Sequence, residues 1–330
     1  MASLPVVDLS CDDRKASSKV VEAMQTVGFV LLENVPHFDE KLVFNATEWF
    51  FNLSDETKFC VTRKKWNKRA KSVYRGYFPV DDTSISYKEG YEFGPEISAD
   101  NPELVTASPF IEHNVWPERK EGEDEEAFVI FKQTIRSQYK AVFDASVNFM
   151  RLLALGLGLK ENFFDHLFIP NTLSTLRLLC YPPRPGPPPA DAVCDDGTVL
   201  YCNDHADVGI MTMVTTFNKP GLQIKSPDGN WLDIQSPPGS VIVNLGEMLS
   251  EMSGNNIKAT HHRVVDTGGM RHSCAFFLEP GYFARMPRSL PLPDQQGERK
   301  KSEDKMEFFE FGPLLRERLK RNTEFGDDWI

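Results

Sequence analysis

Two short polar segments in the C-terminal half hold the residues best suited to bind a metal. His205 and Asp207 stand two apart, and His262 is the second histidine of a His-His-Arg-Val-Val segment. Two imidazoles and one carboxylate form the facial triad that holds Fe(II) in non-haem oxygenases, with positions left open for O2 and a co-substrate. Residues two apart in a strand project to the same side, so we expect His205 and Asp207 to reach one ion together. A lone His-x-Asp tripeptide is usually an ordinary polar strand end. The additional histidine, His262, favours the metal site.

A second polar pair follows nine residues after the last of these histidines. Arg271 and Ser273 would share one face of a largely apolar strand that ends near residue 278. A guanidinium on an inward face must be paired, because burying a lone charge is costly. A dicarboxylate held bidentately by the arginine and hydrogen-bonded by the serine would pair it. The alternative is an arginine at a strand end whose head group reaches water; the metal triad favours the co-substrate.

These motifs, in this order and at these separations, resemble the plant and fungal type of Fe(II)/2-oxoglutarate-dependent dioxygenases related to isopenicillin N synthase. The resemblance covers nearly the whole chain. It includes the segments Leu-Pro-Val-Val-Asp at residues 4–8, Gly-Phe-Val-Leu-Leu at 28–32, Arg-Gly-Tyr at 75–77, Lys-Glu-Gly-Tyr-Glu-Phe-Gly at 88–94, Asn-Val-Trp-Pro at 114–117, Leu-Leu-Cys-Tyr-Pro-Pro at 178–183, Gly-Leu-Gln at 221–223 and Asn-Leu-Gly-Glu at 244–247.

The resemblance implies roles for individual residues. His205, Asp207 and His262 would bind iron, and the His-Arg-Val spacing selects His262 over its neighbour His261. Arg271 and Ser273 would hold the distal carboxylate of 2-oxoglutarate, with Tyr181 as a further hydrogen-bond donor. Many relatives have Asn-Tyr-Tyr-Pro where this chain has Leu-Cys-Tyr-Pro at 179–182. The family's halogenases lack the carboxylate ligand, so the presence of Asp207 disfavours halogenation.

The implied cofactors and reaction follow from the same resemblance. The cofactor is Fe(II), the co-substrates are 2-oxoglutarate and O2, and ascorbate is a candidate stimulant. Oxidative decarboxylation to succinate and CO2 would drive oxidation of a substrate C–H bond, and hydroxylation, desaturation and cyclisation all stay open. A second hypothesis is an oxidase of the isopenicillin N synthase or aminocyclopropane carboxylate oxidase type, which uses no 2-oxoglutarate. A third is a non-catalytic binding protein on the same fold, which predicts a damaged ligand set.

Composition agrees with a cytoplasmic enzyme. The chain has 330 residues, 41% of them hydrophobic, and a formal net charge of −11. This charge disfavours nucleic-acid binding. No apolar run approaches the roughly 20 residues of a membrane helix, and the N-terminus does not resemble a signal peptide. Six cysteines without CxxC spacing indicate reduced thiols. We therefore expect a monomer whose partner is a small-molecule substrate, without a nucleic-acid or membrane partner.

The pattern of the chain predicts an α+β protein: a double-stranded β-helix (jelly-roll) barrel with a helical N-terminal region packed on it. Helices are expected at 12–27 and 38–52, and a long one from the acidic run at 121–126 to about residue 157, with a terminal helix at 310–322 after a charged loop at 298–304. The expected regions are 1–125, a connecting helix region 126–173, the jelly-roll core 174–285 and a C-terminal part 286–330. Short strands are expected at 175–181, 199–202, 208–216, 221–225, 231–234, 240–245, 259–265 and 273–278.

The substrate residues have the weakest sequence signal. Residues 63–75 form a basic run in an otherwise acidic chain, which is most often a solvated surface segment. The run leads into Arg75-Gly76-Tyr77, which resembles a substrate-lid region of the family, and Arg177 lies on a predicted barrel strand. Arg75, Tyr77 and Arg177 are therefore our candidate substrate residues, and they favour a small anionic, carboxylate-bearing substrate over a neutral one.

Overall fold

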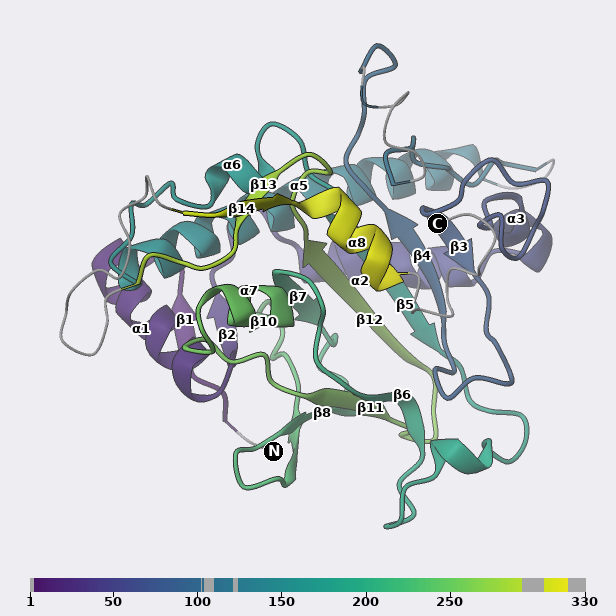
Figure 1. Ribbon diagram of the computed structural model, residues 1–330. Helices are drawn as coiled ribbons and strands as arrows, with labels where there is room; N and C mark the ends of the chain where they lie inside the picture. The colour runs from purple at the N-terminus through teal and green to yellow at the C-terminus, as the bar shows by residue number, and fades with distance from the viewer. Residues whose placement is uncertain (1–2, 102, 104–109, 121–123, 293–305, 320–330) are drawn as a thin grey trace.

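The computed structural model describes residues 3–101, 103, 110–120, 124–292 and 306–319. Its larger sheet has eight strands in the order β1-β2-β10-β7-β12-β5-β4-β3, and a second sheet has the order β6-β11-β8-β9 (Figure 1). The strands of these two sheets are β1 (Val6–Asp8), β2 (Phe29–Glu33), β3 (Gly76–Phe78), β4 (Glu89–Phe93), β5 (Thr175–Tyr181), β6 (Leu200–His205), β7 (Met211–Thr215), β8 (Leu222–Lys225), β9 (Trp231–Ile234), β10 (Val241–Leu245), β11 (His262–Val265) and β12 (Arg271–Leu278).

One apolar layer lies between the two sheets. Leu179 and Tyr181 of β5 and Ile242 of β10 join one buried cluster with Leu222 of β8 and Val264 of β11. Side chains alternate along a strand, so the neighbouring positions of the large sheet point to its other face. Two sheets that enclose an apolar layer are consistent with the expected jelly-roll fold.

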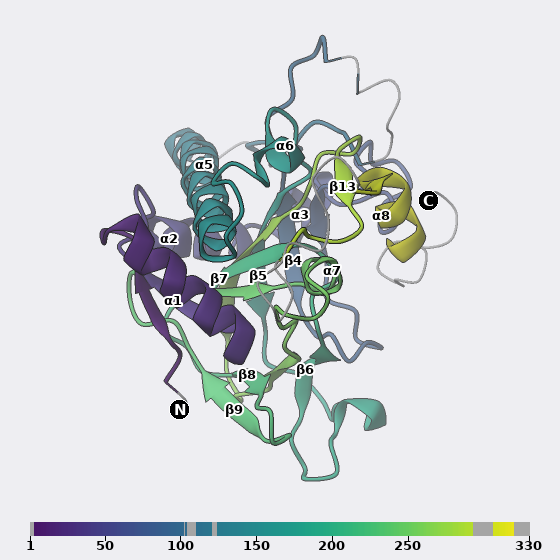
Figure 2. The same cartoon turned by 60° about the vertical axis from the view of Figure 1, so that its left-hand side comes forward.

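Three helices, α1 (Asp13–Thr26), α2 (Glu40–Phe51) and α5 (Glu125–Gly156), cover the other face of the large sheet. Further helices are α3 (Asp55–Cys60), α6 (Asp165–Phe168), α7 (Glu247–Met252) and α8 (Phe311–Leu319), with a 3-10 turn η1 (Ala190–Ala192). Residues of α1, α2 and α5 share a second buried cluster with Leu176 and Leu178 of β5 and Phe276 of β12. In Figure 2 these three helices form one group, away from β8 and β9.

The N-terminal half contributes strands to the large sheet in addition to the helices that we expected. Its strands β1 and β2 extend the large sheet beyond β10, and β4 and β3 extend it beyond β5. Strands with buried apolar or aromatic side chains on both faces, such as Phe-Val-Leu-Leu in β2, fit a sheet that is covered on both sides. The strands of the first 93 residues thus belong to the same sheet as β5, β7, β10 and β12.

Local signals explain the ends of the main helices. Asp12 caps α1 by accepting hydrogen bonds from the backbone N–H groups of Arg14 and Lys15. Gly28 follows α1 with a φ of 75°, and a Cβ there would collide with the Thr260 hydroxyl and the Lys258 carbonyl. Thr260 in turn donates to the Val27 carbonyl at 2.7 Å. The end of α1 therefore anchors the segment that leads into His262.

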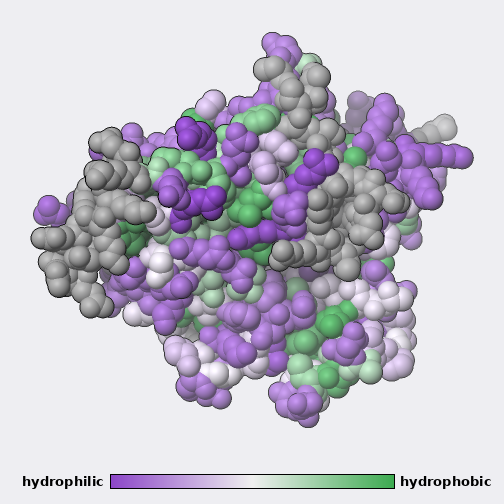
Figure 3. Space-filling model, viewed as in Figure 1, coloured by the Kyte–Doolittle hydropathy of each residue, from purple (hydrophilic) through white to green (hydrophobic). Residues whose placement is uncertain are grey.

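The long helix and the C-terminal part agree with the sequence in outline. α5 begins at Glu125, within the expected acidic start, of which 121–123 lie outside the described residues. After β12 a small sheet pairs β13 (Arg285–Pro287) with β14 (Phe308–Glu310), and the expected charged loop at 298–304 also lies outside the described part. Among the coloured residues of Figure 3, hydrophilic ones take up most of the visible face. Among the described helices, none combines the length and apolar character that crossing a membrane requires.

Candidate metal centre

The structure brings His205, Asp207 and His262 together between the two sheets. One ligand atom from each lies within 4.8 Å of the others. The Nε2 atoms of both histidines lie 3.8 Å from the same Asp207 oxygen, Oδ1. β6 and β11 pair with His205 opposite His262, which places the two rings side by side with centroids 4.3 Å apart. Two imidazole nitrogens and one carboxylate oxygen at these separations can bind one divalent cation.

Backbone carbonyls orient both imidazoles. Nδ1 of His205 lies 2.8 Å from the Asn203 carbonyl, and Nδ1 of His262 lies 3.2 Å from the Thr260 carbonyl. A proton held on Nδ1 by a carbonyl leaves the Nε2 lone pair for a metal. The same tautomer is therefore selected at both histidines, with Nε2 directed at Asp207.

Asp207 does not lie in the strand where our sequence reasoning placed it. β6 ends at His205, and Asp207 belongs to the turn before β7. The turn packs against Gly246, where a Cβ would lie 2.2 Å from the Gly209 carbonyl oxygen. The backbone N–H of Glu247 also donates to the Asp207 carbonyl at 2.7 Å. A tight turn held against β10 and α7, rather than strand alternation, thus brings the carboxylate to the histidines.

Two residues that sequence reasoning did not assign to the site hold the carboxylate itself. Asp207 Oδ2 accepts hydrogen bonds from the Thr212 hydroxyl at 2.6 Å and from the Asn244 amide at 2.7 Å. Both donors are buried. These bonds occupy Oδ2 and leave Oδ1 facing the two Nε2 atoms. A polar residue at a buried position of an apolar strand, such as Asn244 in Val-Ile-Val-Asn-Leu, was the available sequence signal.

The three side chains also influence one another's protonation. Burial would raise the pKa of Asp207, but His262, His205 and the donated hydrogen bonds outweigh it and keep the pKa below its usual value. Burial lowers the pKa of His262. Burial has the same effect on His205, but the adjacent Cys202 and Asp207 overcome it and raise its pKa to about 9. An ionised carboxylate beside a neutral His262 suits metal binding, which must displace the proton of His205.

His261 points away from this cluster. Its side chain is about half exposed, and Nδ1 lies 2.5 Å from Asp204 Oδ1. Asp204 also pairs with Lys225 at 3.3 Å. Neighbouring residues along an extended chain face opposite sides, so only one of the two histidines can reach Asp207. The geometry selects His262.

Arg271, Ser273 and Tyr181 lie together deeper between the sheets. Arg271 pairs with Tyr181 in the β12–β5 ladder, and Ser273 stands on the same face two residues further along. The Arg271 guanidinium lies 4.9 Å from the Tyr181 ring centre, and its Nε donates to the Pro220 carbonyl at 2.9 Å. Arg271 is only 3% exposed, and its Nη1 atom is buried without a hydrogen-bond partner in the described structure.

The three candidate substrate residues lie in different surroundings. Arg177 shares the inward face of β5 with Tyr181, and its guanidinium lies 4.9 Å from the Phe277 ring centre. Phe277 pairs with Thr212, the residue that holds Asp207. Arg177 also forms an ion pair with Glu92 and keeps about a fifth of its side chain exposed. The structure therefore brings Arg177 to the metal end of the space between the sheets.

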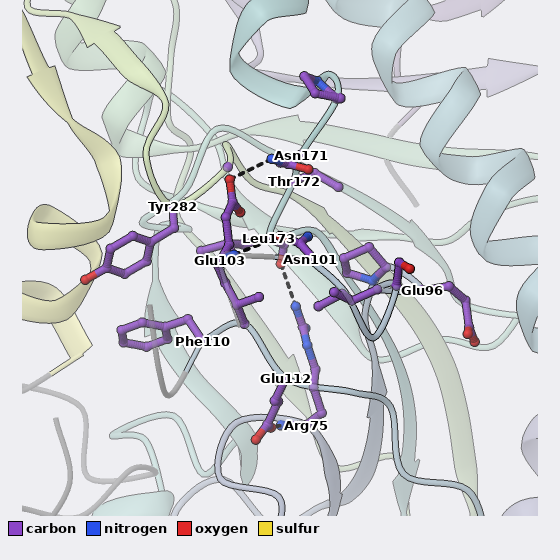
Figure 4. A pocket seen from close by; sticks show the side chains of 16 residues that line it. Arg75, Glu96, Asn101, Glu103, Phe110, Glu112, Asn171, Thr172, Leu173 and Tyr282 are labelled. Carbon is purple, nitrogen blue, oxygen red and sulfur yellow. Dashed lines mark hydrogen bonds between the residues drawn. The ribbon is translucent and has the colours of Figure 1, made fainter. Parts of the chain in front are cut away.

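Arg75 and Tyr77 are not brought there. Arg75 is 1% exposed, and its guanidinium donates to the Thr175 hydroxyl and to the Leu173 carbonyl at 2.8 Å. It lies beside a cavity of about 260 Å³ whose lining contains none of the metal-ligand candidates (Figure 4). Tyr77 joins the helix-side cluster and donates to Glu89 at 2.7 Å. We place neither residue in the substrate site proposed below.

Comparison with known proteins decides the family. The family description "2OG-Fe(II) oxygenase superfamily" matches residues 172–280, and "non-haem dioxygenase in morphine synthesis N-terminal" matches residues 4–119. Isopenicillin N synthase of Streptomyces jumonjinensis is 30% identical over 289 residues, which cover 85% of each chain. This chain belongs to the 2OG-Fe(II) oxygenase superfamily.

Two further relatives are connected with 2-oxoglutarate, one through its name and the other through the ligand in its solved structure. The 2-oxoglutarate-Fe(II) type oxidoreductase hxnY of Emericella nidulans is 30% identical over 291 residues, covering 83% of this chain and 78% of that protein. A full-length Neurospora crassa protein, solved in complex with alpha-KG (2-oxoglutarate) and thymine, is 26% identical with a TM-score of 0.73, covering 96% of both chains. The protein is thus a dioxygenase, and its family implies Fe(II) and 2-oxoglutarate.

The residues present in this oxygenase fit both Fe(II) and 2-oxoglutarate. His205, Asp207 and His262 supply the facial set of two nitrogens and one oxygen that Fe(II) takes in such enzymes. The buried and unsatisfied Nη1 of Arg271 fits a carboxylate, which would pair the charge and complete its hydrogen bonds. The ligand set is intact, which contradicts the expectation from a non-catalytic protein on this fold.

Proposed function

We propose that this oxygenase couples oxidative decarboxylation of 2-oxoglutarate to oxidation of a C–H bond in a small natural-product-type molecule. In this proposal His205, Asp207 and His262 bind the iron from one side, and Arg271, Ser273 and Tyr181 bind the distal carboxylate of 2-oxoglutarate. The bound iron supplies the oxidising chemistry, and the protein orients the reactants and excludes water. Thr212 and Asn244 hold the Asp207 carboxylate in position.

One observation carries the assignment of the co-substrate site. Arg271 is buried, its Nη1 has no partner in the described structure, and the neighbouring Ser273 is 2% exposed. A buried guanidinium without an anion is strongly unfavourable, which supports a ligand that arrives with a carboxylate. Burial lowers the pKa of Arg271, as expected for a cation that lacks an anionic partner.

A second candidate function follows from the named relatives. Isopenicillin N synthase is among the proteins at 30% identity, and the second hypothesis of our sequence analysis was an oxidase of that type. In that case Arg271 and Ser273 would hold the carboxylate of the substrate itself. The two functions make different demands on 2-oxoglutarate, so one experiment separates them.

The test uses the full chain under anaerobic conditions. Addition of Fe(II) and 2-oxoglutarate should produce a weak visible charge-transfer band, and admission of O2 should release succinate. The variant Arg271→Leu should lose the band at the same 2-oxoglutarate concentration, whereas His261→Ala, a surface substitution directly before β11, should keep it. Normal substrate oxidation in the complete absence of 2-oxoglutarate would establish the second candidate instead.

For the substrate we propose a small molecule with an anionic oxygen that binds Arg177. The position of Arg177 over Phe277 and its partial exposure support this role. Arg63 and Arg177 both pair with Glu92, and a substrate carboxylate would be a further anion beside the partly exposed Arg177. Comparing succinate release with carboxylate-bearing and neutral compounds tests it; turnover of neutral compounds alone, unaffected by Arg177→Ala, would contradict it.

The proposal extends to the oligomeric state, compartment, partners and core fold of the enzyme. We infer a monomeric enzyme that acts in the cytoplasm on a small molecule, without nucleic-acid or membrane partners, and that has a closed jelly-roll barrel as its catalytic core within residues 174–285. The net charge of −11 and the six free cysteines support the partner and compartment. Sedimentation of the purified chain tests the monomer.

A further inference from the structure

Glu279 is a partly buried residue near the metal centre that none of the roles above uses. It follows β12 directly, and its backbone N–H donates to the Ser174 hydroxyl at 3.0 Å. A Cβ added to Gly209, two residues after Asp207, would lie 3.9 Å from Glu279 Oε1. Along β12 the side chains of Arg271, Ser273 and Phe277 occupy the inward face, and Glu279 continues this alternation. The carboxyl therefore lies beside the turn that carries Asp207.

One oxygen of this carboxyl group is not satisfied by the protein. Oε2 is buried without a hydrogen-bond partner, and within the described ranges no basic nitrogen lies close enough to form an ion pair with it. Buried side-chain oxygens in folded proteins nearly always have a partner. An unsatisfied one at a position of close packing carries a desolvation cost of its own. Such an atom beside the turn that carries Asp207 favours a donor that arrives with a ligand.

The charges around Glu279 limit the chemistry of that donor. Burial and the nearby Glu92 raise its pKa to about 7, although Arg75, Arg177 and a hydrogen bond from Tyr74 favour the ionised form. The guanidinium of Arg75 is already occupied by acceptors of the protein. Arg177 is paired with Glu92, and about a fifth of its side chain is exposed. One basic and one acidic group thus border the metal end of the space between the sheets.

We propose that Glu279 determines substrate specificity by accepting a hydrogen bond from a substrate N–H group. The inference rests on the proposed function, and it narrows the substrate class. The substrate would carry an anionic oxygen that binds Arg177 and an N–H group that binds Glu279 Oε2. A compound with an ether or ester oxygen in place of the N–H would leave Oε2 unsatisfied and bring a second acceptor against it.

The experiment compares pairs of cyclic carboxylates that differ in one ring atom. They are L-proline and tetrahydrofuran-2-carboxylate, L-pyroglutamate and the γ-lactone of 2-hydroxyglutarate, and indole-2-carboxylate and benzofuran-2-carboxylate. Binding to the anaerobic Fe(II) and 2-oxoglutarate complex is measured by calorimetry and by the shift of the visible band. In at least one pair the N–H compound should bind about ten- to a hundredfold more tightly than its oxygen analogue.

Variants assign the preference to one side chain. Glu279→Met, which has similar length and no strong acceptor, should bind both members of the pair equally. Glu96→Gln, at a surface carboxylate paired with Arg136, should keep the preference. If Glu279→Met does not fold, Glu279→Gln replaces it and should reduce the preference, because it retains only one acceptor oxygen and adds a donor.

Three results would overturn the inference: no preference in any pair, a preference that survives removal of the carboxylate, or binding of none of the six compounds. Each is distinguishable from failure of the proposed function. That failure would appear in the same samples before any compound is added, as a missing visible band with Fe(II) and 2-oxoglutarate and as no succinate after O2 is admitted.

Discussion

Arg271 and Arg75 are both buried arginines. Arg271 is the first residue of β12 and Arg75 directly precedes β3, and the surroundings of their guanidinium groups differ. Arg271 is 3% exposed and Arg75 is 1% exposed. Arg75 donates to the Thr175 hydroxyl and the Leu173 carbonyl, and the backbone around it is held by Glu112, which accepts the N–H groups of Val73 and Tyr74. Arg271 donates to the Pro220 carbonyl, and its Nη1 has no described partner.

The difference shows which property marks a ligand site. Burial of the charged group is almost equal in the two cases, so burial alone does not identify a binding residue. In this pair, the guanidinium of Arg75 meets protein acceptors and stabilises the fold, whereas the unmet donor of Arg271 is available to an anion. The same criterion separates Asp207, whose Oδ1 is left to a metal, from Glu112, whose oxygens hold backbone N–H groups.

The largest effect is expected at the metal ligands. His262→Ala removes one of three protein ligands and should abolish turnover and iron binding while the protein stays folded, because His262 borders the site at the edge of the core. His261→Ala is the matched control, since its partner is Asp204 on the outer side. Iron binding by calorimetry and folding by circular dichroism measure both. Loss of iron binding in His261→Ala alone would show that the wrong histidine was chosen.

The two arginines should respond in opposite ways. Arg271→Leu should raise the 2-oxoglutarate concentration needed for half-maximal succinate release by two to three orders of magnitude, which corresponds to about 3–4 kcal/mol for a buried charge pair. Ser273→Ala and Tyr181→Phe should have smaller effects. Unchanged 2-oxoglutarate dependence in Arg271→Leu would remove the distinction between the two arginines.

Arg75→Leu should instead lower the free energy of unfolding, by about 2–4 kcal/mol, because it leaves the Thr175 hydroxyl and the Leu173 carbonyl without their donor. Chemical denaturation measures this loss. The affinity of the remaining folded protein for 2-oxoglutarate should stay within about twofold of the original. A stable Arg75→Leu variant with weak substrate turnover would instead support the role of Arg75 as a substrate residue.

The carboxylate supports should have intermediate effects. Thr212→Val and Asn244→Ala each remove one hydrogen bond to Asp207 Oδ2, and each should weaken metal binding about ten- to a hundredfold. Thr215→Val, at a buried threonine of the same strand that donates to Glu40, is the control and should leave metal affinity unchanged. Competition with a chelator measures the affinities.

The smallest effect concerns stability and pH at Glu279. Its pKa is raised to about 7 in the folded protein from an ordinary value near 4.5, so the folded state binds the proton more tightly than the unfolded state. Stability should therefore fall as pH rises from about 5 to 7, by about 1–3 kcal/mol. Glu279→Gln should remove this decline, and Glu96→Gln should keep it. Parallel denaturation curves for all three proteins between pH 5 and 8 would contradict the raised pKa.

Much of the site could be predicted because its chemistry is local. The His-x-Asp pair, the second histidine of His-His and the Arg-x-Ser pair are short patterns that are weak alone and favour this site only together, and strand alternation placed His261 and His262 on opposite sides, as in the structure. The strands 175–181 and 231–234 also have the expected ends, because Pro, Gly and Asn residues mark their limits.

The rest depended on contacts between distant parts of the chain. The sequence by itself determined the ligand types, the order of the motifs and the alternation along each strand, since these depend on neighbouring residues. Only the tertiary structure decided that Asp207 reaches the metal through a turn packed on Gly246, that Thr212 and Asn244 hold it, and that β1–β4 extend the core sheet. It also decided that Arg75 finds its acceptors about a hundred residues away, while Arg271 keeps an unmet donor. Whether a buried polar group is satisfied depends on atoms that only the folded chain brings within hydrogen-bonding distance.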